Sequence, residues 1–364
     1  MSQTKVEAPF VENNANFRNI IINGAMQVAQ RSTSVTGIGA SADYFTLDRF
    51  DMYFQNTAGR LTMSQTAVTD LPGFTQCLKL DCTTADTSIA AAENAVLQYH
   101  VEGQHLQHLK KGTSSAEKTT LSFYVKGDQA ATYTCELADK DNSRQNTQTF
   151  SVTTSWNRVV LVFDGDTTGT YNNDNAKSLS IQIHLQAGSN STSGTFTSNT
   201  WAANTDANTV KSDQTQFFDS TDRELFITGF QYEVGDAATD FEHLPHDVQL
   251  QRCQRYYYQM GPGAQYDPFM VGACNGANSC YGMVHFPVEM RGDPALETTG
   301  TSADYCVYAG GHNPFPCDSG PTSNTIDKYG MRIYFTCSND LVAGEAGEML
   351  TYNSSAYLGF DAEL

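Results

Sequence analysis

Two glutamates of the chain have the residue type that glycoside hydrolases use for catalysis. Such enzymes place one carboxyl group as an acid and a second as a base or nucleophile, and Glu233 and Glu242 lie near each other in the sequence. The chain holds 40 Asp and Glu residues, however, so neighbouring acids arise by chance. We expect Glu233 and Glu242 to have structural roles and the chain to have no catalytic residues, with polysaccharide depolymerase as the alternative.

Four histidines form two pairs with the i, i+3 spacing that can place two metal ligands on one face of a helix. The pairs are His105 with His108 and His243 with His246, and Pro245 disfavours a helix at the second. The sequence has no HExxH motif, no Gly-x-Ser-x-Gly elbow and no phosphate-binding glycine loop. We therefore expect these histidines at the surface or at an interface, and we predict no metal site and no cofactor.

Two acidic turns have the oxygen-rich composition that calcium prefers. One contains Asp139, Asp141 and Asn142, and the other contains Asp164 and Asp166. Neither turn has the spacing of an EF-hand loop. A solvated turn is the default interpretation of each, and a structural calcium ion is the alternative.

One tryptophan is the candidate ligand-binding residue. Trp201 lies in a polar stretch from Gly188 to Asp213, where Phe196 is the other aromatic residue. An exposed indole stacks well on a sugar ring or on a partner surface. The same side chain would equally well fill the inside of its own loop, so both roles of Trp201 stay open.

Alternation of apolar and polar residues predicts the elements that must position these residues. A period of two marks strands with one buried and one solvated face. Nothing in the chain has the helical pattern of a βαβ fold, so we predict an all-β protein with a jelly-roll-like antiparallel sandwich. The alternating apolar sets are Leu121, Phe123 and Val125; Tyr133, Cys135 and Leu137; Leu179, Ile181, Ile183 and Leu185; and Met331, Ile333 and Phe335.

Two segments are predicted to be helical. The first is the alanine-rich segment 89–98, and the second begins after Asp247, which is a plausible N-cap. The Gly-Pro-Gly sequence at 261–263 would end the second helix. We predict an N-terminal arm at 1–16, the sandwich at 17–247, a short linker helix at 248–260 and a smaller C-terminal β domain at 261–364.

Charge and cysteine content restrict the partners and the compartment. The formal net charge of −19 disfavours nucleic acid and anionic membranes as partners. No stretch approaches the roughly 20 apolar residues of a membrane span, and residues 1–16 have no signal-peptide pattern. The nine cysteines are an odd number without a CxxC pair, so buried reduced thiols are expected and an opportunistic disulfide is the alternative.

Three segments of the chain have recognisable motifs. The segments are RNIIINGAMQVAQR at 18–31 with DYFTLDRF at 43–50; VEG at 101–103 with TLSFYVK at 120–126; and QYEVG at 231–235 with ATDFE at 238–242 and LQRCQRYY at 250–257. These segments resemble the tail-fibre and related virion proteins of tailed bacteriophages. The middle one also resembles a central strand of carbohydrate-binding sandwich modules, in which Trp156 fits the pattern. The third segment is the most specific, and the ending FDAEL at 360–364 is similar to the same group.

The resemblance implies a non-enzymatic virion structural protein, assembled in the cytoplasm of the bacterial host. It implies a homotrimeric tail fibre or tail-associated appendage that attaches to the host, with a surface glycan as ligand. The segment before the first motif is too short for a fibre shaft, so the arm at 1–16 is expected to bind other virion proteins. A capsid head fibre or decoration protein is the alternative.

Overall fold

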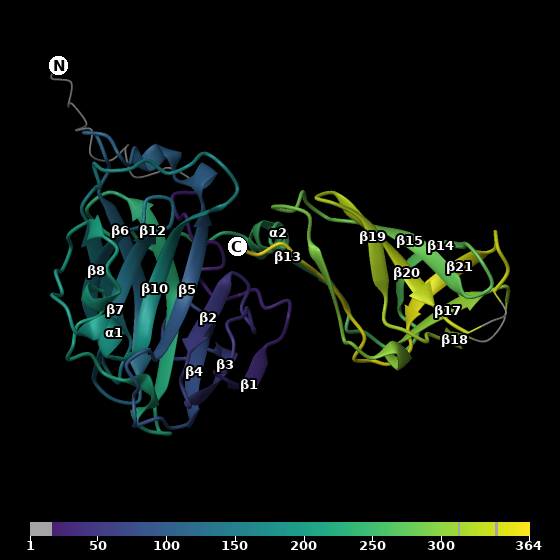
Figure 1. The fold of residues 1–364 in the computed structure, drawn as a ribbon, viewed down its shortest axis with the longest axis horizontal. Helices are drawn as coiled ribbons and strands as arrows, with labels where there is room; N and C mark the ends of the chain where they lie inside the picture. Colours follow the sequence, from purple (N-terminus) through teal and green to yellow (C-terminus); the bar gives the residue numbers. More distant parts are fainter. Residues whose placement is uncertain (1–16, 312–313, 339–340) are drawn as a thin grey trace, which may run out of the picture. The chain divides into compact units, whose positions relative to one another are not determined.

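The computed structural model describes residues 17–311, 314–338 and 341–364. The regular secondary structure of these residues is mostly β-strand, which confirms the predicted fold class (Figure 1). Its contacts divide it into a first unit of residues 1–246 with Leu364 and a second unit of residues 247–363. The predicted docking arm at 1–16 lies outside the described residues. None of the helices in the described residues has the length and apolar character needed to cross a membrane.

The first unit is a sandwich of two six-stranded antiparallel sheets. We call them the β12 sheet and the β10 sheet. The β12 sheet has the order β1 (Ser34–Ile38), β3 (Arg60–Ala67), β4 (Gln76–Thr84), β12 (Glu224–Val234), β6 (Thr119–Gly127) and β9 (Asn157–Phe163). The β10 sheet has the order β11 (Ala202–Ala203), β8 (Arg144–Val152), β7 (Ala131–Asp139), β10 (Lys177–Ala187), β5 (Asn94–Glu102) and β2 (Phe50–Gln55).

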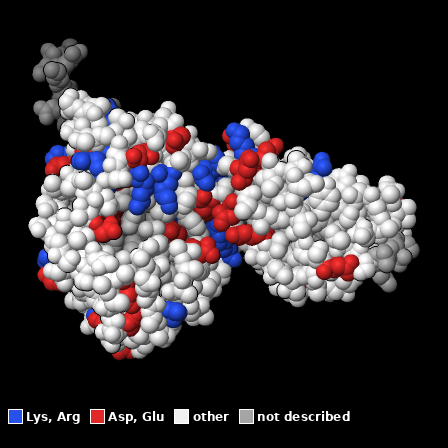
Figure 2. Space-filling view, viewed as in Figure 1, with Lys and Arg blue, Asp and Glu red and all other residues white. Residues whose placement is uncertain are grey.

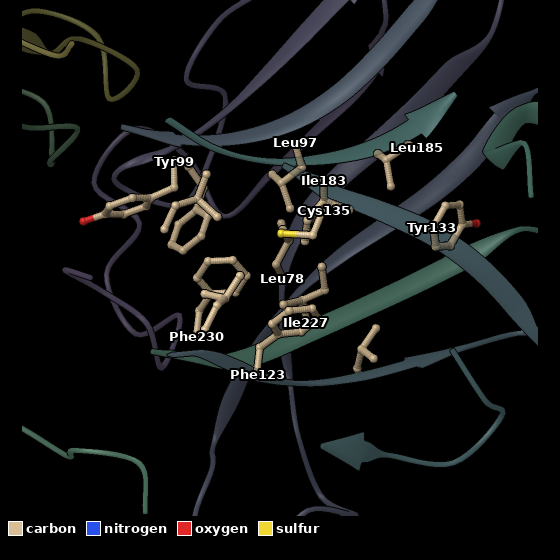
Figure 3. Packing of buried hydrophobic residues seen from close by; sticks show 14 of the residues in the cluster. Leu78, Leu97, Tyr99, Phe123, Tyr133, Cys135, Ile183, Leu185, Ile227 and Phe230 are labelled. Carbon is tan, nitrogen blue, oxygen red and sulfur yellow. The ribbon is translucent and has the colours of Figure 1, made fainter. Parts of the chain in front are cut away.

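Aromatic side chains from both sheets form the centre of the sandwich core (Figure 3). Phe123 of β6 stacks on Phe230 of β12 with ring centroids 5.1 Å apart, and Phe50 of β2 meets Phe230 edge-on at 5.7 Å. Such pairs add roughly 0.5–1.5 kcal/mol each beyond the burial of their area. The predicted alternation is confirmed here, since Phe123, Cys135 and Ile183 are all buried. Polar residues between them therefore face outward.

The helix predicted at 89–98 is wrong, because this part of the chain enters strand β5. Leu97 and Tyr99 lie in the core, whereas Gln98 and His100, which alternate with them, point to the other face. β5 pairs with β10 on one side and with β2 on the other. These two ladders and the burial of alternate side chains outweigh the helix propensity of the preceding alanines.

The second unit has its own core, which includes Tyr305, Met331 and Phe335. A three-stranded sheet has the order β13 (Tyr257–Met260), β22 (Leu358–Asp361) and β16 (Ala295–Thr298). A seven-stranded sheet has the order β18 (Phe315–Pro316), β17 (Tyr305–Ala309), β21 (Ala346–Thr351), β14 (Pro268–Cys274), β15 (Ser279–His285), β20 (Gly330–Thr336) and β19 (Thr322–Asp327).

The linker helix is shorter than the predicted span of 248–260. Helix α2 covers His246–Gln254, and residues 257–260 instead form strand β13. Tyr258 pairs with Phe360 of β22 and stacks on its ring at 5.8 Å, so strand pairing replaces helix in this segment. The other helical segments are short: η2 (Gly103–His105), η3 (Gln107–Leu109), α1 (Ser189–Thr192), η4 (Asp206–Asn208), η5 (Phe217–Asp219) and η6 (Ser302–Asp304).

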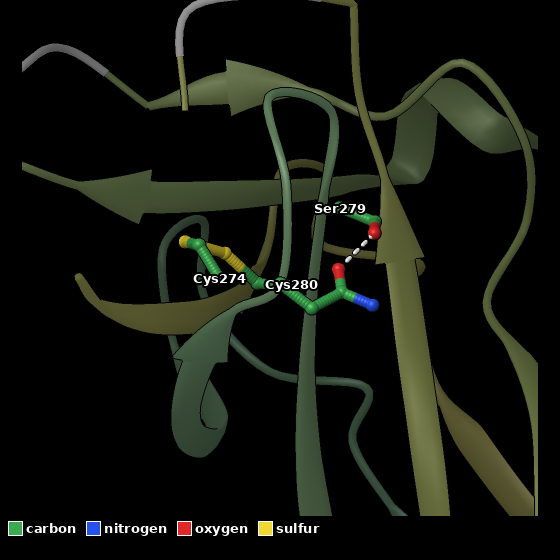
Figure 4. The surroundings of a disulfide bond; sticks show 4 residues. Cys274, Ser279 and Cys280 are labelled. Atoms are coloured by element: carbon green, nitrogen blue, oxygen red, sulfur yellow. Dashed lines mark hydrogen bonds between the residues drawn. A yellow bond between two sulfur atoms is a disulfide. The ribbon is translucent and has the colours of Figure 1, made fainter. Parts of the chain in front are cut away.

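One disulfide joins neighbouring strands of the second unit. Cys274 of β14 and Cys280 of β15 face each other across the ladder and are bonded (Figure 4). The other cysteines of the described residues form no disulfide and are buried. Burial raises the pKa of Cys77 and of Cys306 to about 12, so these thiols stay protonated and unreactive at neutral pH.

Candidate functional site

Both candidate catalytic glutamates are bound by the chain itself. The Glu233 carboxylate, only 2% exposed, accepts hydrogen bonds from the Thr239 backbone N (2.9 Å), the Thr239 hydroxyl (2.7 Å) and Gln231 Nε2 (2.8 Å). Glu242 accepts a bond from the backbone N of Asn19 at 2.9 Å. These contacts fix the start of the first unit and the segment after β12 against that strand. The geometry therefore gives both carboxylates a structural role.

The histidine pairs lie apart from any cluster that could hold a metal. His105 and His108 lie in η2 and η3, and burial lowers the pKa of His108. The His243 ring packs on Phe241 with centroids 4.8 Å apart, and His246 begins α2. Across residues 17–311, 314–338 and 341–364, no group of three or more His, Cys, Asp and Glu side chains is arranged to hold a metal ion.

A lysine ammonium lies between the two acidic turns that were candidate calcium loops. Lys111 Nζ is 2.6 Å from Asp139 Oδ2 and 3.0 Å from Asp166 Oδ2. It also donates to the carbonyls of Thr168 and Gly169, each at 2.9 Å. The ammonium thus occupies an oxygen-lined position of the kind that a calcium ion would take.

A second cation completes this buried ion-pair cluster. Arg144 forms a bidentate ion pair with Asp166: Nε donates to Oδ2 at 2.7 Å and Nη2 donates to Oδ1 at 3.0 Å. Burial raises the pKa of Asp166, but the bonds from Arg144 and Lys111 outweigh it and hold the pKa below its ordinary value. The cluster joins the segments around Lys111, Asp139 and Asp166 and so stabilises one end of the sandwich.

Trp201 lies beside this ion-pair cluster. Its Nε1 donates to the backbone carbonyl of Asp164 at 2.7 Å, and Lys111 Nζ lies 5.5 Å from the ring centroid. The ring packs partly against the sandwich core. These contacts favour the loop-filling role, and ligand binding by Trp201 stays a prediction.

A polar groove of about 470 Å³ lies on the outward face of the β10 sheet. Strand register places four outward residues in one row, because Gln98 pairs with Asp51 and Gln182, and Gln182 pairs with Glu136. Adjacent strands lie about 4.8 Å apart, so the row crosses roughly 14 Å of sheet. Gln98, Gln182 and Glu136 line the floor of the groove. None of the three was expected from the sequence to be a site residue.

The polar segment that follows β10 forms one wall of the groove. Asn190, Asn204 and Thr209 line this wall, and Tyr53 of the edge strand β2 lines the groove as well. Side-chain hydrogen bonds hold the segment on the sheet, including Gln214 Nε2 to the carbonyl of His184 at 3.2 Å. The predicted loop at 188–213 is therefore a packed structural element that gives the sheet a concave face.

The side-chain amides of the groove floor have unused hydrogen-bond donors and acceptors. The side chains of Gln98 and Gln182 make no hydrogen bond to any described residue, and those of Asn190 and Asn204 on the wall make none either. Each amide offers one acceptor oxygen and two N–H donors. Four such groups around one groove can bind a ligand that carries several hydroxyl groups.

Two histidines of the groove are fixed in orientation. His184 Nε2 lies 2.9 Å from Glu136 Oε2, and because a carboxylate only accepts, this nitrogen carries the proton. His100 Nδ1 lies 2.7 Å from Ser180 Oγ. Burial lowers the pKa of His100, so its ring is neutral at neutral pH. Hydrogen bonds thus hold both imidazole rings of the groove in place.

The solved structures to which the chain is similar share little sequence identity with it and have low TM-scores. The enzymatically active domain of bacteriophage CBA120 tailspike protein 4 is 10% identical with a TM-score of 0.29, covering 61% of this chain and 22% of the tailspike chain. A module described as CBM4 is 10% identical with a TM-score of 0.31, covering 58% of this chain and 98% of its own. A putative sugar binding protein from Bacteroides thetaiotaomicron is 10% identical with a TM-score of 0.31, covering 60% of this chain and 100% of its own.

Structural similarity at these TM-scores supports no inference about the site. No protein-family model matches the chain, and no curated protein matches it. The β-sandwich is a finding of the structure itself. The resemblance to phage tail-fibre proteins stays a prediction from the sequence segments.

Proposed function

We propose that this chain is a non-enzymatic carbohydrate-binding protein and that the groove of the β10 sheet is its glycan site. The observation that carries the proposal is the pair Gln98 and Gln182, which face each other on adjacent strands with unoccupied amides. Sugars present neighbouring hydroxyl groups that both donate and accept hydrogen bonds. An amide can bind two such groups at once through its oxygen and its nitrogen.

The rest of the groove supports a carbohydrate over a nucleotide or an apolar ligand. The lining includes one aromatic ring, Tyr53, which is 37% exposed and can stack on a sugar face. Apolar side chains are few, which argues against a hydrophobic ligand. The groove carboxylate Glu136 is bonded to His184 at 2.9 Å, and the second carboxylate of the lining, Asp206, lies on the wall.

We further propose that the protein is a homotrimeric attachment protein in the virion of a tailed bacteriophage. The sequence segments at 18–31, 43–50 and 231–257 support this role, and the arm at 1–16 would bind a neighbouring virion protein. A capsid head fibre or decoration protein is the alternative location. Cryo-electron microscopy of the intact particle separates the two, because tail density supports attachment and density on the capsid supports decoration.

The groove is tested by replacing its two floor glutamines. Relative to wild type, the Gln98→Ala/Gln182→Ala variant is expected to bind immobilised oligosaccharides at least about tenfold more weakly, since each lost hydrogen bond is worth about 1 kcal/mol. Surface plasmon resonance against a panel of neutral and acidic oligosaccharides measures the change.

The matched control is Gln76→Ala, a half-buried glutamine at the start of β4 in the opposite sheet. Its binding should equal that of the wild type. Equal binding by the double variant, with unchanged circular dichroism, would show that the glycan site lies elsewhere. Absence of binding to every oligosaccharide of the panel would overturn the proposed function.

A further inference from the structure

We infer that the groove takes an acidic oligosaccharide whose anionic group binds at the end formed by Lys140 and Lys177. This inference rests on the proposed carbohydrate function and adds the chemical class of the glycan. Both lysines line the groove, together with the neutral amides of its floor. The groove therefore combines a region suited to hydroxyl groups with a region suited to a carboxylate or a sulfate ester.

The topology of the β10 sheet brings the two lysines together. Lys177 is the first residue of β10, and Lys140 directly follows the last residue of β7. The two strands are antiparallel neighbours, so the end of one lies beside the start of the other. The backbone N of Lys140 donates to the carbonyl of Ser178 at 2.8 Å and fixes this arrangement.

A β-bulge accounts for the orientation of Lys177. Along β10, Leu179 and Ile181 point into the core, and simple alternation would send Lys177 the same way. The register with β5 shifts between Lys177 and Leu179, and such a bulge redirects the side chains next to it. Accordingly, Lys177 Nζ lies 3.3 Å from Nε2 of the groove residue His100.

Two cations in one groove are a notable concentration for this chain. The sequence holds 21 Lys and Arg residues against 40 acids, and Figure 2 shows basic side chains gathered at a few places on a mostly uncharged surface. Lys140 is exposed and makes no ion pair with any described residue. Two carboxylates line the groove: Glu136, which is bonded to His184, and Asp206, on the wall. A third carboxylate, Asp51, lies next to the lining, with Oδ1 3.3 Å from His100 Nε2.

The lysine end and the floor amides are neighbouring parts of one groove. Lys177 Nζ approaches His100 Nε2 to 3.3 Å, and His100 lies two residues after Gln98 on β5. Two residues of a strand correspond to roughly 7 Å at about 3.3 Å per residue. We therefore expect a short acidic oligosaccharide whose anionic substituent lies at the lysine end while its hydroxyl groups contact the floor amides.

The test compares acidic glycans with charge-neutralised forms of the same sugars. The probes are oligogalacturonate, oligosialate and a sulfated oligosaccharide, together with the methyl esters of the first two and neutral gluco- and manno-oligosaccharides. Calorimetry on the full chain is expected to show binding to at least one acidic probe about tenfold tighter than to its neutral form. Raising the salt concentration should weaken this binding, because a charge contact at the groove rim is screened.

Substitutions of the lysines locate the effect. Lys140→Gln, at an exposed position that should not affect folding, and Lys140→Gln/Lys177→Gln should each lower affinity for the acidic probe and leave affinity for its neutral form unchanged. Lys118→Gln, an exposed lysine outside the groove lining, is the matched control.

The outcomes separate this inference from the proposed function. Equal binding of acidic and neutral forms, unaffected by the lysine variants but lost in Gln98→Ala/Gln182→Ala, would overturn the acidic class and leave the glycan groove in place. Failure of every probe to bind would overturn both. Preference for the sulfated probe over both carboxylates would assign the lysine end to a sulfate ester.

Discussion

Replacing Lys111 by methionine is expected to lower the free energy of unfolding of the sandwich by about 3–5 kcal/mol. The lysine is only 7% exposed and bonds to two carboxylates and two carbonyls. Methionine fills a similar volume but leaves Asp139 and Asp166 facing each other with only Arg144 to offset their charge. Removal of one partner of a buried ion cluster is costly because the remaining charges stay desolvated.

Urea denaturation followed by tryptophan fluorescence measures this loss. Lys118→Met is the matched control, because Lys118 and its partner Asp164 are each about half exposed, and surface ion pairs contribute little. A Lys111→Met variant as stable as the wild type would show that the cluster does not hold this end of the fold.

The same cluster sets the response of the wild type to acid. The Asp166 pKa is lowered in the folded state, so its contribution is present above its ordinary value of 3.8 and is lost as the pH falls through the lowered folded value. The stability of the wild type should therefore decrease below about pH 4. In Lys111→Met this part of the decrease should be smaller, because one of the groups that lowers the pKa is gone.

The sequence predicted the strands and not the groove, for a physical reason. Alternation identifies which side of β10 is buried, as at Ile181 and Ile183, but it gives every polar position on the other side the same meaning. Gln98 and Gln182 become a site only because the register places them opposite each other and the segment after β10 adds a wall. Register and wall are long-range features that local patterns do not contain.

The error at 89–98 and the calcium alternative have related causes. The alanines before β5 have helix propensity, yet two neighbouring strands and the burial of Leu97 and Tyr99 determine the structure there. The acidic turns around Asp139 and Asp166 have a suitable composition for a cation, and the cation present is Lys111. Its approach depends on tertiary contacts and could not be predicted from spacing.

The motif glutamate Glu233 is expected to stabilise the fold and to have no part in hydrolysis. The Glu233→Ala change should lower the free energy of unfolding by about 3 kcal/mol, because it leaves the donors on Thr239 and Gln231 without their acceptor in a buried place. Arg18, whose Nε lies 3.6 Å from the carboxylate, also loses its ion-pair partner. Thermal and urea denaturation give the magnitude.

A second glutamate of the same strand provides the control for Glu233. Glu224 pairs with Lys79 at 2.5 Å near the start of β12, and its side chain is 35% exposed, so Glu224→Ala should cost at most about 1 kcal/mol. Glu233→Gln keeps one acceptor oxygen and should recover part of the loss. Release of reducing sugar ends by the wild type, abolished in Glu233→Gln while folding persists, would contradict the structural role and favour a depolymerase. Because the hydrogen bonds of Glu233 tie QYEVG to ATDFE, we expect the most specific segment of the sequence to report on the architecture of the sandwich and not on its chemistry.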